Sequence, residues 1–262
     1  MNMNLMNKLD NLKKDRDFIM THLIYGYPDI KTSLEIAKAM EKGGSSILEI
    51  QLPFSDPIAD GPTIVGACQK ALEKPKTVKG YIDFIRKISN SVSIPIVVMS
   101  YTNPMIKYGV NKFIKEISDA GASGVIIADL PLDSEEGKLM VASCRKYNIY
   151  PVTVLSPGVP IDRVKELSKY MMGFIYCTSR QGVTGADSHF DKNLSDFIKN
   201  IREIKNIPVA VGFGVKDKKD VKNLLKICDI VIAGSVFIKA IENTPSNKVY
   251  KKIKDTVKDL ID

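Results

Sequence analysis

The stretch LEIQLPFSDPIADGP, residues 48–62, organises the interpretation of the whole chain. It begins as a short apolar strand on which Glu49 and Gln51 share one face, and it ends in a loop with proline and glycine that carries Asp56 and Asp60. A carboxylate on a buried strand is unfavourable unless it is paired or protonated. We therefore interpret Glu49 and the loop aspartates as candidate catalytic groups; a structural carboxylate that accepts backbone hydrogen bonds or an ion pair is the alternative.

Strand and helix patterns alternate on both sides of this stretch. Nearly continuous apolar segments are typical of a parallel sheet buried on both faces, and closing eight of them into a barrel removes the exposed edges. The sequence therefore predicts an α/β fold, a single (βα)8 TIM-barrel domain over residues 1–262 with an extra N-terminal helix at about Asn4–Lys14. The predicted strands are Phe18–Ile24, the segment around Glu49, Ile96–Ser100, Val125–Ala128, Pro151–Leu155, Phe174–Cys177, Val209–Val211 and Ile230–Ala233.

Two helix boundaries are also predicted. Thr32, followed by Glu35 three residues later, resembles a capping box and indicates a helix that begins at Thr32. After the third strand, Asn103-Pro104 indicates a loop, and the next helix is expected at about Val110–Asp119.

Composition limits the class of protein. A chain of 262 residues with 44% hydrophobic and 26% charged residues is long enough for one barrel with a full core. Its net charge of +8 comes from scattered lysines and not from an aromatic-rich basic block, so we expect a small anionic substrate and no nucleic acid. The cysteines have no CxxC spacing, and no run of 18 apolar residues occurs, so we expect free thiols, no membrane segment and a cytoplasmic location.

The C-terminal ends of barrel strands carry the chemistry of this fold. No lysine lies there, which argues against Schiff-base chemistry, and two histidines in different contexts make a histidine metal site improbable, so no metal is expected. Carboxylate acid/base chemistry remains, with Glu49 and Asp60 as first candidates, Asp56 or Asp129 as further ones, and phenols from Tyr101 and Tyr176.

Glycines after the last strands indicate a phosphate site. Gly212-Phe213-Gly214 follows the seventh strand and Gly234-Ser235 opens a helix after the eighth, where barrels commonly bind phosphate through backbone N–H groups. Gly185 is a further candidate in the loop after the sixth strand. Tight turns, which also need glycine, are the alternative.

Six sequence blocks now carry a resemblance to a known family. In order they are LEIQLPFSDPIADGPTI at 48–64, YTNP at 101–104, ADLP at 128–131, SRQGVTG at 179–185, GFGV at 212–215 and AGS at 233–235. Together they resemble the tryptophan synthase alpha subunit family over nearly the whole chain.

The resemblance implies a lyase that cleaves indole-3-glycerol phosphate to indole and glyceraldehyde 3-phosphate by a retro-aldol step. It implies that Glu49 is the acid/base and that Asp60 stabilises the ring N–H. It also implies that this chain needs no cofactor, and that its partner is a beta subunit with pyridoxal phosphate in an α2β2 assembly.

The same resemblance assigns the substrate contacts and the mobile parts. Tyr176 would orient the substrate, and the loops 53–61 and 178–189 resemble the lids of the family. The predicted substrate-binding residues are Tyr101, Tyr176, Gly185, Phe213, Gly214, Gly234 and Ser235.

Three residues depart from the family pattern: His22 replaces a usually aromatic or apolar residue, Ile24 a small hydroxyl residue and Gln51 a glycine. All three are expected near the indole end of the pocket. Gln51 is expected either to donate a hydrogen bond to Glu49 or to fill substrate space, so that Gln51→Gly should raise kcat/KM; an outward turn of Gln51 without effect is the alternative.

Three functional interpretations stay open at this point. The first is the lyase subunit, and the second is a lyase that works without a beta partner and releases free indole. The third is an alpha-like subunit with little turnover that binds and activates a beta partner.

Overall fold

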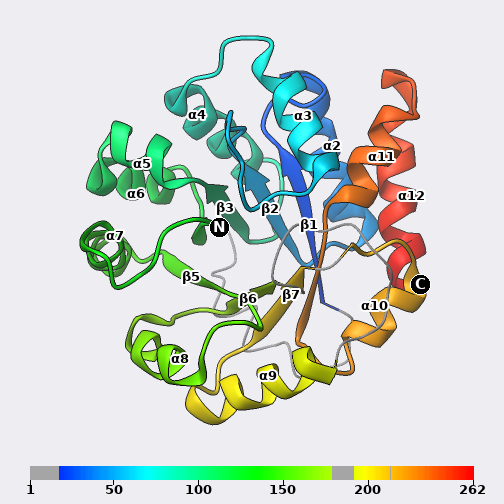
Figure 1. The fold of residues 1–262 in the computed structure, drawn as a ribbon. Helices are drawn as coiled ribbons and strands as arrows, with labels where there is room; N and C mark the ends of the chain where they lie inside the picture. The colour runs from blue at the N-terminus through cyan, green and yellow to red at the C-terminus, as the bar shows by residue number, and fades with distance from the viewer. Residues whose placement is uncertain (1–17, 179–191, 213) are drawn as a thin grey trace.

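The computed structural model describes residues 18–178, 192–212 and 214–262, and in them eight parallel strands close into one barrel (Figure 1). Each strand pairs with the next in the chain, and β8 pairs with β1. The prediction of a TIM barrel is therefore confirmed. The strands are β1 Ile19–Ile24, β2 Ile47–Gln51, β3 Ile96–Ser100, β4 Gly124–Ile127, β5 Tyr150–Leu155, β6 Ile175–Thr178, β7 Val209–Gly212 and β8 Ile230–Ala233.

Helices surround the barrel on its outside (Figure 1). None of those in the described part of the chain is long and apolar enough to cross a membrane. The predicted helix at Asn4–Lys14 lies outside the described residues. The helices are α2 Ile30–Gly43, α3 Pro62–Leu72, α4 Val78–Ser89, α5 Thr102–Tyr108, α6 Val110–Asp119, α7 Glu135–Lys146, α8 Ile161–Leu167, α9 Lys192–Ile204, α10 Lys218–Leu224, α11 Ser235–Glu242 and α12 Val249–Ile261, with short 3-10 helices at Ser168–Tyr170 and Ser246–Lys248.

The start of α2 differs from the prediction. Asp29 is the N-cap, because its Oδ1 accepts a hydrogen bond from the backbone N–H of Thr32 at 2.9 Å. The hydroxyl of Thr32 donates to Oδ2 of the same carboxylate at 2.6 Å. Thr32 therefore lies inside the first turn, and the predicted capping box was wrong by three residues because a stronger cap precedes it.

A second difference follows β3. The segment that the Asn103-Pro104 pair marked as a loop is the short helix α5. Pro104 is compatible with it because it lies in the first turn, where a backbone N–H has no partner within the helix.

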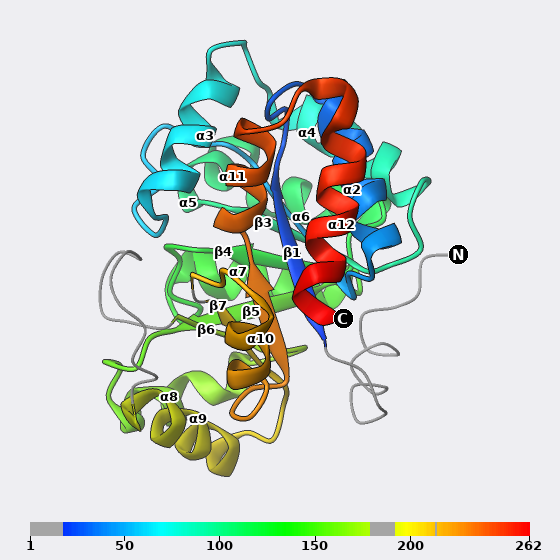
Figure 2. The ribbon, with the colours of Figure 1, turned by 90° about the vertical axis from the view of Figure 1, so that its right-hand side faces the viewer.

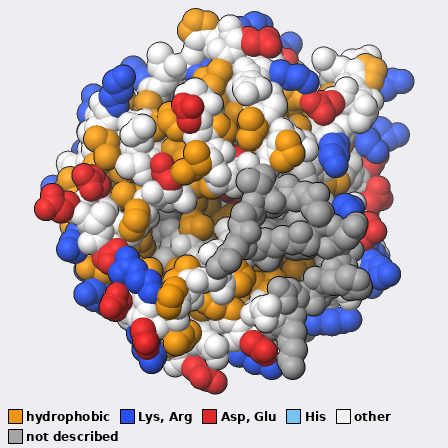
Figure 3. All heavy atoms as spheres, in the orientation of Figure 1, with side chains coloured by type: hydrophobic (Ala, Val, Ile, Leu, Met, Phe, Trp, Pro, Cys, Tyr) orange, Lys and Arg blue, Asp and Glu red, His pale blue; other side chains and the backbone are white. Residues whose placement is uncertain are grey.

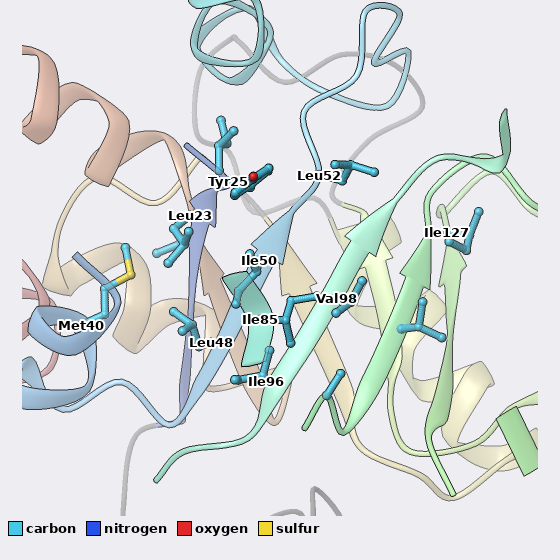
Figure 4. Packing of buried hydrophobic residues seen from close by; sticks show 14 of the residues in the cluster. Leu23, Tyr25, Met40, Leu48, Ile50, Leu52, Ile85, Ile96, Val98 and Ile127 are labelled. Atoms are coloured by element: carbon cyan, nitrogen blue, oxygen red, sulfur yellow. The ribbon is translucent and has the colours of Figure 1, made fainter. Parts of the chain in front are cut away.

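Two clusters of buried apolar residues form the core, one inside the barrel and one between the strands and the helices. Ile47 belongs to the inner cluster, whereas Leu48 and Ile50 belong to the outer one, where Figure 4 shows them beside neighbouring strands and helices. Since side chains alternate along a strand, Glu49 and Gln51 point into the barrel. The buried face that the sequence predicted for these two polar residues is the barrel interior.

The C-terminal helix α12 closes the ring by lying alongside α2, which is far from it in sequence (Figure 2). Gly43 at the end of α2 makes this close approach possible. A Cβ atom at this position would lie 2.6 Å from Cβ of Val257 and 2.8 Å from the carbonyl oxygen of Lys254. The packing of the last helix therefore depends on one glycine.

Candidate active site

A cavity opens at the C-terminal ends of the strands, where a barrel carries its chemistry. It leaves about 850 Å³ of space between the side chains, part of which is open solvent. Figure 3 shows hydrophobic side chains gathered around the centre of one face, with lysine and arginine spread around its edge. The lining residues are His22, Glu49, Ala59, Asp60, Gly61, Ile64, Met99, Ile126, Ala128, Val154, Tyr176, Thr178, Gly212, Gly214, Ile232, Gly234 and Ser235.

Glu49 lies at the bottom of this cavity beside a histidine. The register of β1 and β2 pairs His22 with Glu49, and both side chains point inward. Nδ1 of His22 lies 3.5 Å from Oε2 of Glu49, an ion-pair distance longer than an ordinary hydrogen bond. His22 is 6% exposed and Glu49 3% exposed, so the pair is shielded from solvent.

Asp60 reaches the same cavity from the loop between β2 and α3. Its Oδ2 accepts hydrogen bonds from Nε2 of Gln51 at 2.6 Å and from the hydroxyl of Tyr101 at 2.9 Å. The same hydroxyl accepts from the backbone N–H of Ala59 at 3.2 Å. Burial raises the pKa of Asp60, while the charge of His22 and the two hydrogen bonds partly counteract this rise.

The position of Gln51 differs from all three outcomes considered from sequence, a hydrogen bond to Glu49, filling of substrate space and an outward turn. Its side chain is fully buried and donates to Asp60 instead of Glu49. Strand alternation explains the direction, because Gln51 is the last residue of β2 and the Asp60 loop folds back over that end. Ile24, the third departure from the family pattern, is buried in the outer cluster and does not line the cavity.

Tyr176 and Tyr101 have different positions. Tyr176 on β6 lines the cavity, and its ring lies so close to Gly212 that a Cβ there would be 2.4 Å from the phenol oxygen. Tyr101 is fully buried, stacks on Phe54 at 5.3 Å between ring centroids, and contacts Asp60. Burial first, and then the neighbouring carboxylates, raise the pKa of both phenols, so both keep their protons at neutral pH.

One part of the cavity lining, the glycine wall, is formed by Gly214 after β7 and by Gly234-Ser235 at the start of α11. A Cβ at Gly214 would meet nothing within 4 Å, so the space in front of this backbone is open. Backbone N–H groups at a helix N-terminus are suited to an anion. Gly185 and Phe213, two further predicted substrate contacts, lie outside the described residues.

The apolar lining was not identified from sequence. It comes from inner positions of four strands, from the residue after β4, from the Asp60 loop and from the first turn of α3; for the strand positions, alternation within each predicted strand was the available signal. These side chains give the cavity a surface suited to a flat apolar group between the carboxylates and the glycine wall. They are Ala59, Ile64, Met99, Ile126, Ala128, Val154 and Ile232.

Fold and site together define a TIM-barrel enzyme with one buried and one partly buried carboxylate at a largely apolar cavity that glycine backbone also lines. The sequence model of the family described as tryptophan synthase alpha chain matches residues 9–260. Among curated relatives, the tryptophan synthase alpha chain of Petrotoga mobilis is 37% identical over 97% of this chain and 99% of its own length. That of Desulforapulum autotrophicum is 38% identical over 86% of this chain and 88% of its own length.

The fold is similar to a solved structure of tryptophan synthase from Mycobacterium tuberculosis, with a TM-score of 0.89, 28% identity, and coverage of 99% of this chain and 97% of that one. The chain belongs to the tryptophan synthase alpha chain family. Its members catalyse the cleavage of indole-3-glycerol phosphate, a lyase reaction of tryptophan biosynthesis. The alpha chain carries no cofactor, and pyridoxal phosphate belongs to the beta subunit with which the family works.

Proposed function

We propose that Glu49 and Asp60 are the catalytic residues of this lyase and that the glycine wall holds the substrate phosphate. One observation carries the proposal: both carboxylates line the same cavity as the glycine wall of Gly214, Gly234 and Ser235. An indole ring fits the apolar part, and a phosphate fits the backbone wall.

In this proposal Glu49 moves the two protons that the cleavage requires. Protonated Glu49 gives its proton to C3 of the indole ring, which forms a cationic indolenine. The carboxylate then takes the proton of the glycerol hydroxyl next to C3, and the bond between that carbon and C3 breaks. The bonding electrons return to the ring, so indole and glyceraldehyde 3-phosphate leave and Glu49 is protonated again.

Asp60 is proposed to stabilise the positive charge that develops on the ring. Both of its protein donors bond Oδ2, which leaves Oδ1 for the ring N–H. An ionised carboxylate held by fixed donors is suited to this task, because it needs no reorganisation as the charge forms. Tyr176, which also lines the cavity, orients the substrate.

We further propose an α2β2 assembly in the cytoplasm, with the loop 53–62 as a contact for the beta subunit. This loop exposes Asp56 and the apolar side chain of Ile58, which is 74% exposed. An exposed apolar side chain on a loop that also carries Asp60 supports a partner contact that communicates with the site.

The test is an assay of the purified chain with indole-3-glycerol phosphate, alone and with a cognate beta subunit. We expect cleavage that requires Glu49 and Asp60 and that rises when the beta subunit is added. Equal rates with and without beta subunit would support the stand-alone lyase instead. No cleavage in either case, together with a faster beta reaction, would support the alpha-like binding subunit.

A further inference from the structure

His22 is the one described histidine, and the lyase mechanism does not use it. It lines the cavity on β1, with Nδ1 3.5 Å from the Glu49 carboxylate, and its ring lies against Gly234, where a Cβ would be 3.4 Å from Cβ of His22. His22 therefore lies between the acid/base carboxylate and the phosphate wall.

Three buried atoms at this part of the site lack hydrogen-bond partners among the described residues: Nε2 of His22, Oε2 of Glu49 and Oε1 of Gln51. Gln51 donates its Nε2 to Asp60, so its Oε1 remains as an acceptor. A neutral imidazole can serve only one of its two sides. With its proton on Nδ1 it leaves Nε2 and Oε1 of Gln51 unpaired, and with its proton on Nε2 it turns a lone pair toward the Glu49 carboxylate, whereas an imidazolium carries a donor on each nitrogen. Protonated His22 complements Glu49 on one side and Gln51 on the other.

We propose that His22 is a positioning residue that works as an imidazolium: it compensates the charge of Asp60, keeping that group ionised for the reaction, and the charge that Glu49 gains when it gives its proton to C3. This inference rests on the proposed roles of these two residues. It assigns a purpose to two departures from the family pattern, since His22 and Gln51 each contact a carboxylate of the site.

The charges around His22 support this assignment. Glu49 on β2 and Asp60 in the following loop are the carboxylates that face it, and Tyr101 and Tyr176 are neutral phenols. Burial lowers the pKa of His22, but the negative charge and hydrogen bonding of Glu49, then Asp60 and Gln51, outweigh burial and raise it above its ordinary value. In return, the positive charge of His22 counteracts the rise that burial causes in the pKa of Asp60.

The first test needs no turnover, so it is independent of the proposed reaction. The chain has only two histidines, His22 and His189, so a histidine-labelled sample gives two NMR titration curves that His22→Phe assigns. We expect the His22 midpoint to lie above about 6.5 and to fall by roughly one to three units in Glu49→Gln. Glu35→Gln, a matched change on the surface of α2, should leave it unchanged.

A midpoint at or below the ordinary value, or one that Glu49→Gln leaves in place, overturns the inference. Should Glu49→Gln fail to fold, Asp60→Asn carries the test, and the midpoint must then fall in that variant by a smaller amount.

The second test asks whether the charge serves the reaction. His22→Phe and His22→Gln both remove the charge, and the second keeps a polar group. We expect the acid limb of the kcat/KM profile to move to higher pH by about one unit in both, because Asp60 loses a positive neighbour. If the acid limbs of the kcat/KM profiles of both variants coincide with that of the parent, the charge role is refuted, whatever the absolute rates are.

Discussion

The removal of the Gln51 side chain tests how Asp60 is held. Gln51→Ala deletes the 2.6 Å hydrogen bond from Nε2 to Oδ2 of Asp60 and leaves only the hydroxyl of Tyr101 on that oxygen. A hydrogen bond to a charged group contributes about 1.5–3 kcal/mol, and the lower end applies because Asp60 is partly exposed. If all of it supports the transition state, kcat/KM falls about tenfold.

This expectation reverses the one drawn from sequence, where Gln51→Gly was to raise kcat/KM. The reason is the group to which Gln51 donates its hydrogen bond. A donor to Asp60 holds a proposed catalytic carboxylate in place, whereas a donor to Glu49 was expected to hinder catalysis. The assay is steady-state cleavage of indole-3-glycerol phosphate by the purified chain. Gln69→Ala on the exposed side of α3 is the matched control. A Gln51→Ala chain as fast as its parent, or faster, refutes the holding role.

Four further outcomes are expected. Glu49→Gln or Asp60→Asn should lower turnover by roughly 100-fold or more without changing the circular dichroism spectrum. Ser235→Asp should weaken the inhibition of the lyase by inorganic phosphate, because it puts a negative charge at the proposed phosphate wall. Gly43→Ala should lower the free energy of unfolding by roughly 1–3 kcal/mol, measured in urea, because α12 leaves no room for a Cβ. Finally, the stabilisation that the raised pKa of His22 contributes is fully present below its ordinary value of 6.5 and is lost as pH rises through the folded value. The Tm of the parent should therefore fall relative to that of His22→Phe as pH rises from 6.5 through that folded value.

A specific result would contradict each of these four expectations. Normal turnover in either carboxylate variant removes that residue from the mechanism, and unchanged phosphate inhibition moves the anion site elsewhere. A Gly43→Ala chain as stable as its parent means that α12 shifts without cost. A difference in Tm that stays constant across the pH range means that the pKa of His22 is the same in the folded and unfolded states.

The fold could be predicted from the sequence because it depends on local patterns. Eight nearly continuous apolar segments, each followed by helical spacing, leave few closures other than a parallel barrel. The inward direction of Glu49 followed from alternation along one strand, which needs no knowledge of the neighbours. Local errors were small: a better cap three residues upstream of Thr32, and a proline tolerated in the first turn of α5.

The pairing within the site was decided only by the tertiary structure. The chain contains Gln51, Asp60 and Tyr101 at positions that alternation alone cannot bring together, since the loop between β2 and α3 must fold back over the barrel for one carboxylate oxygen to meet both donors. The contact of His22 with Glu49 likewise needs the register of β1 against β2, a relation between two strands separated by a whole helix. Sequence periodicity fixes which face a side chain occupies, whereas the partner it meets there depends on how strands far apart in the chain are aligned.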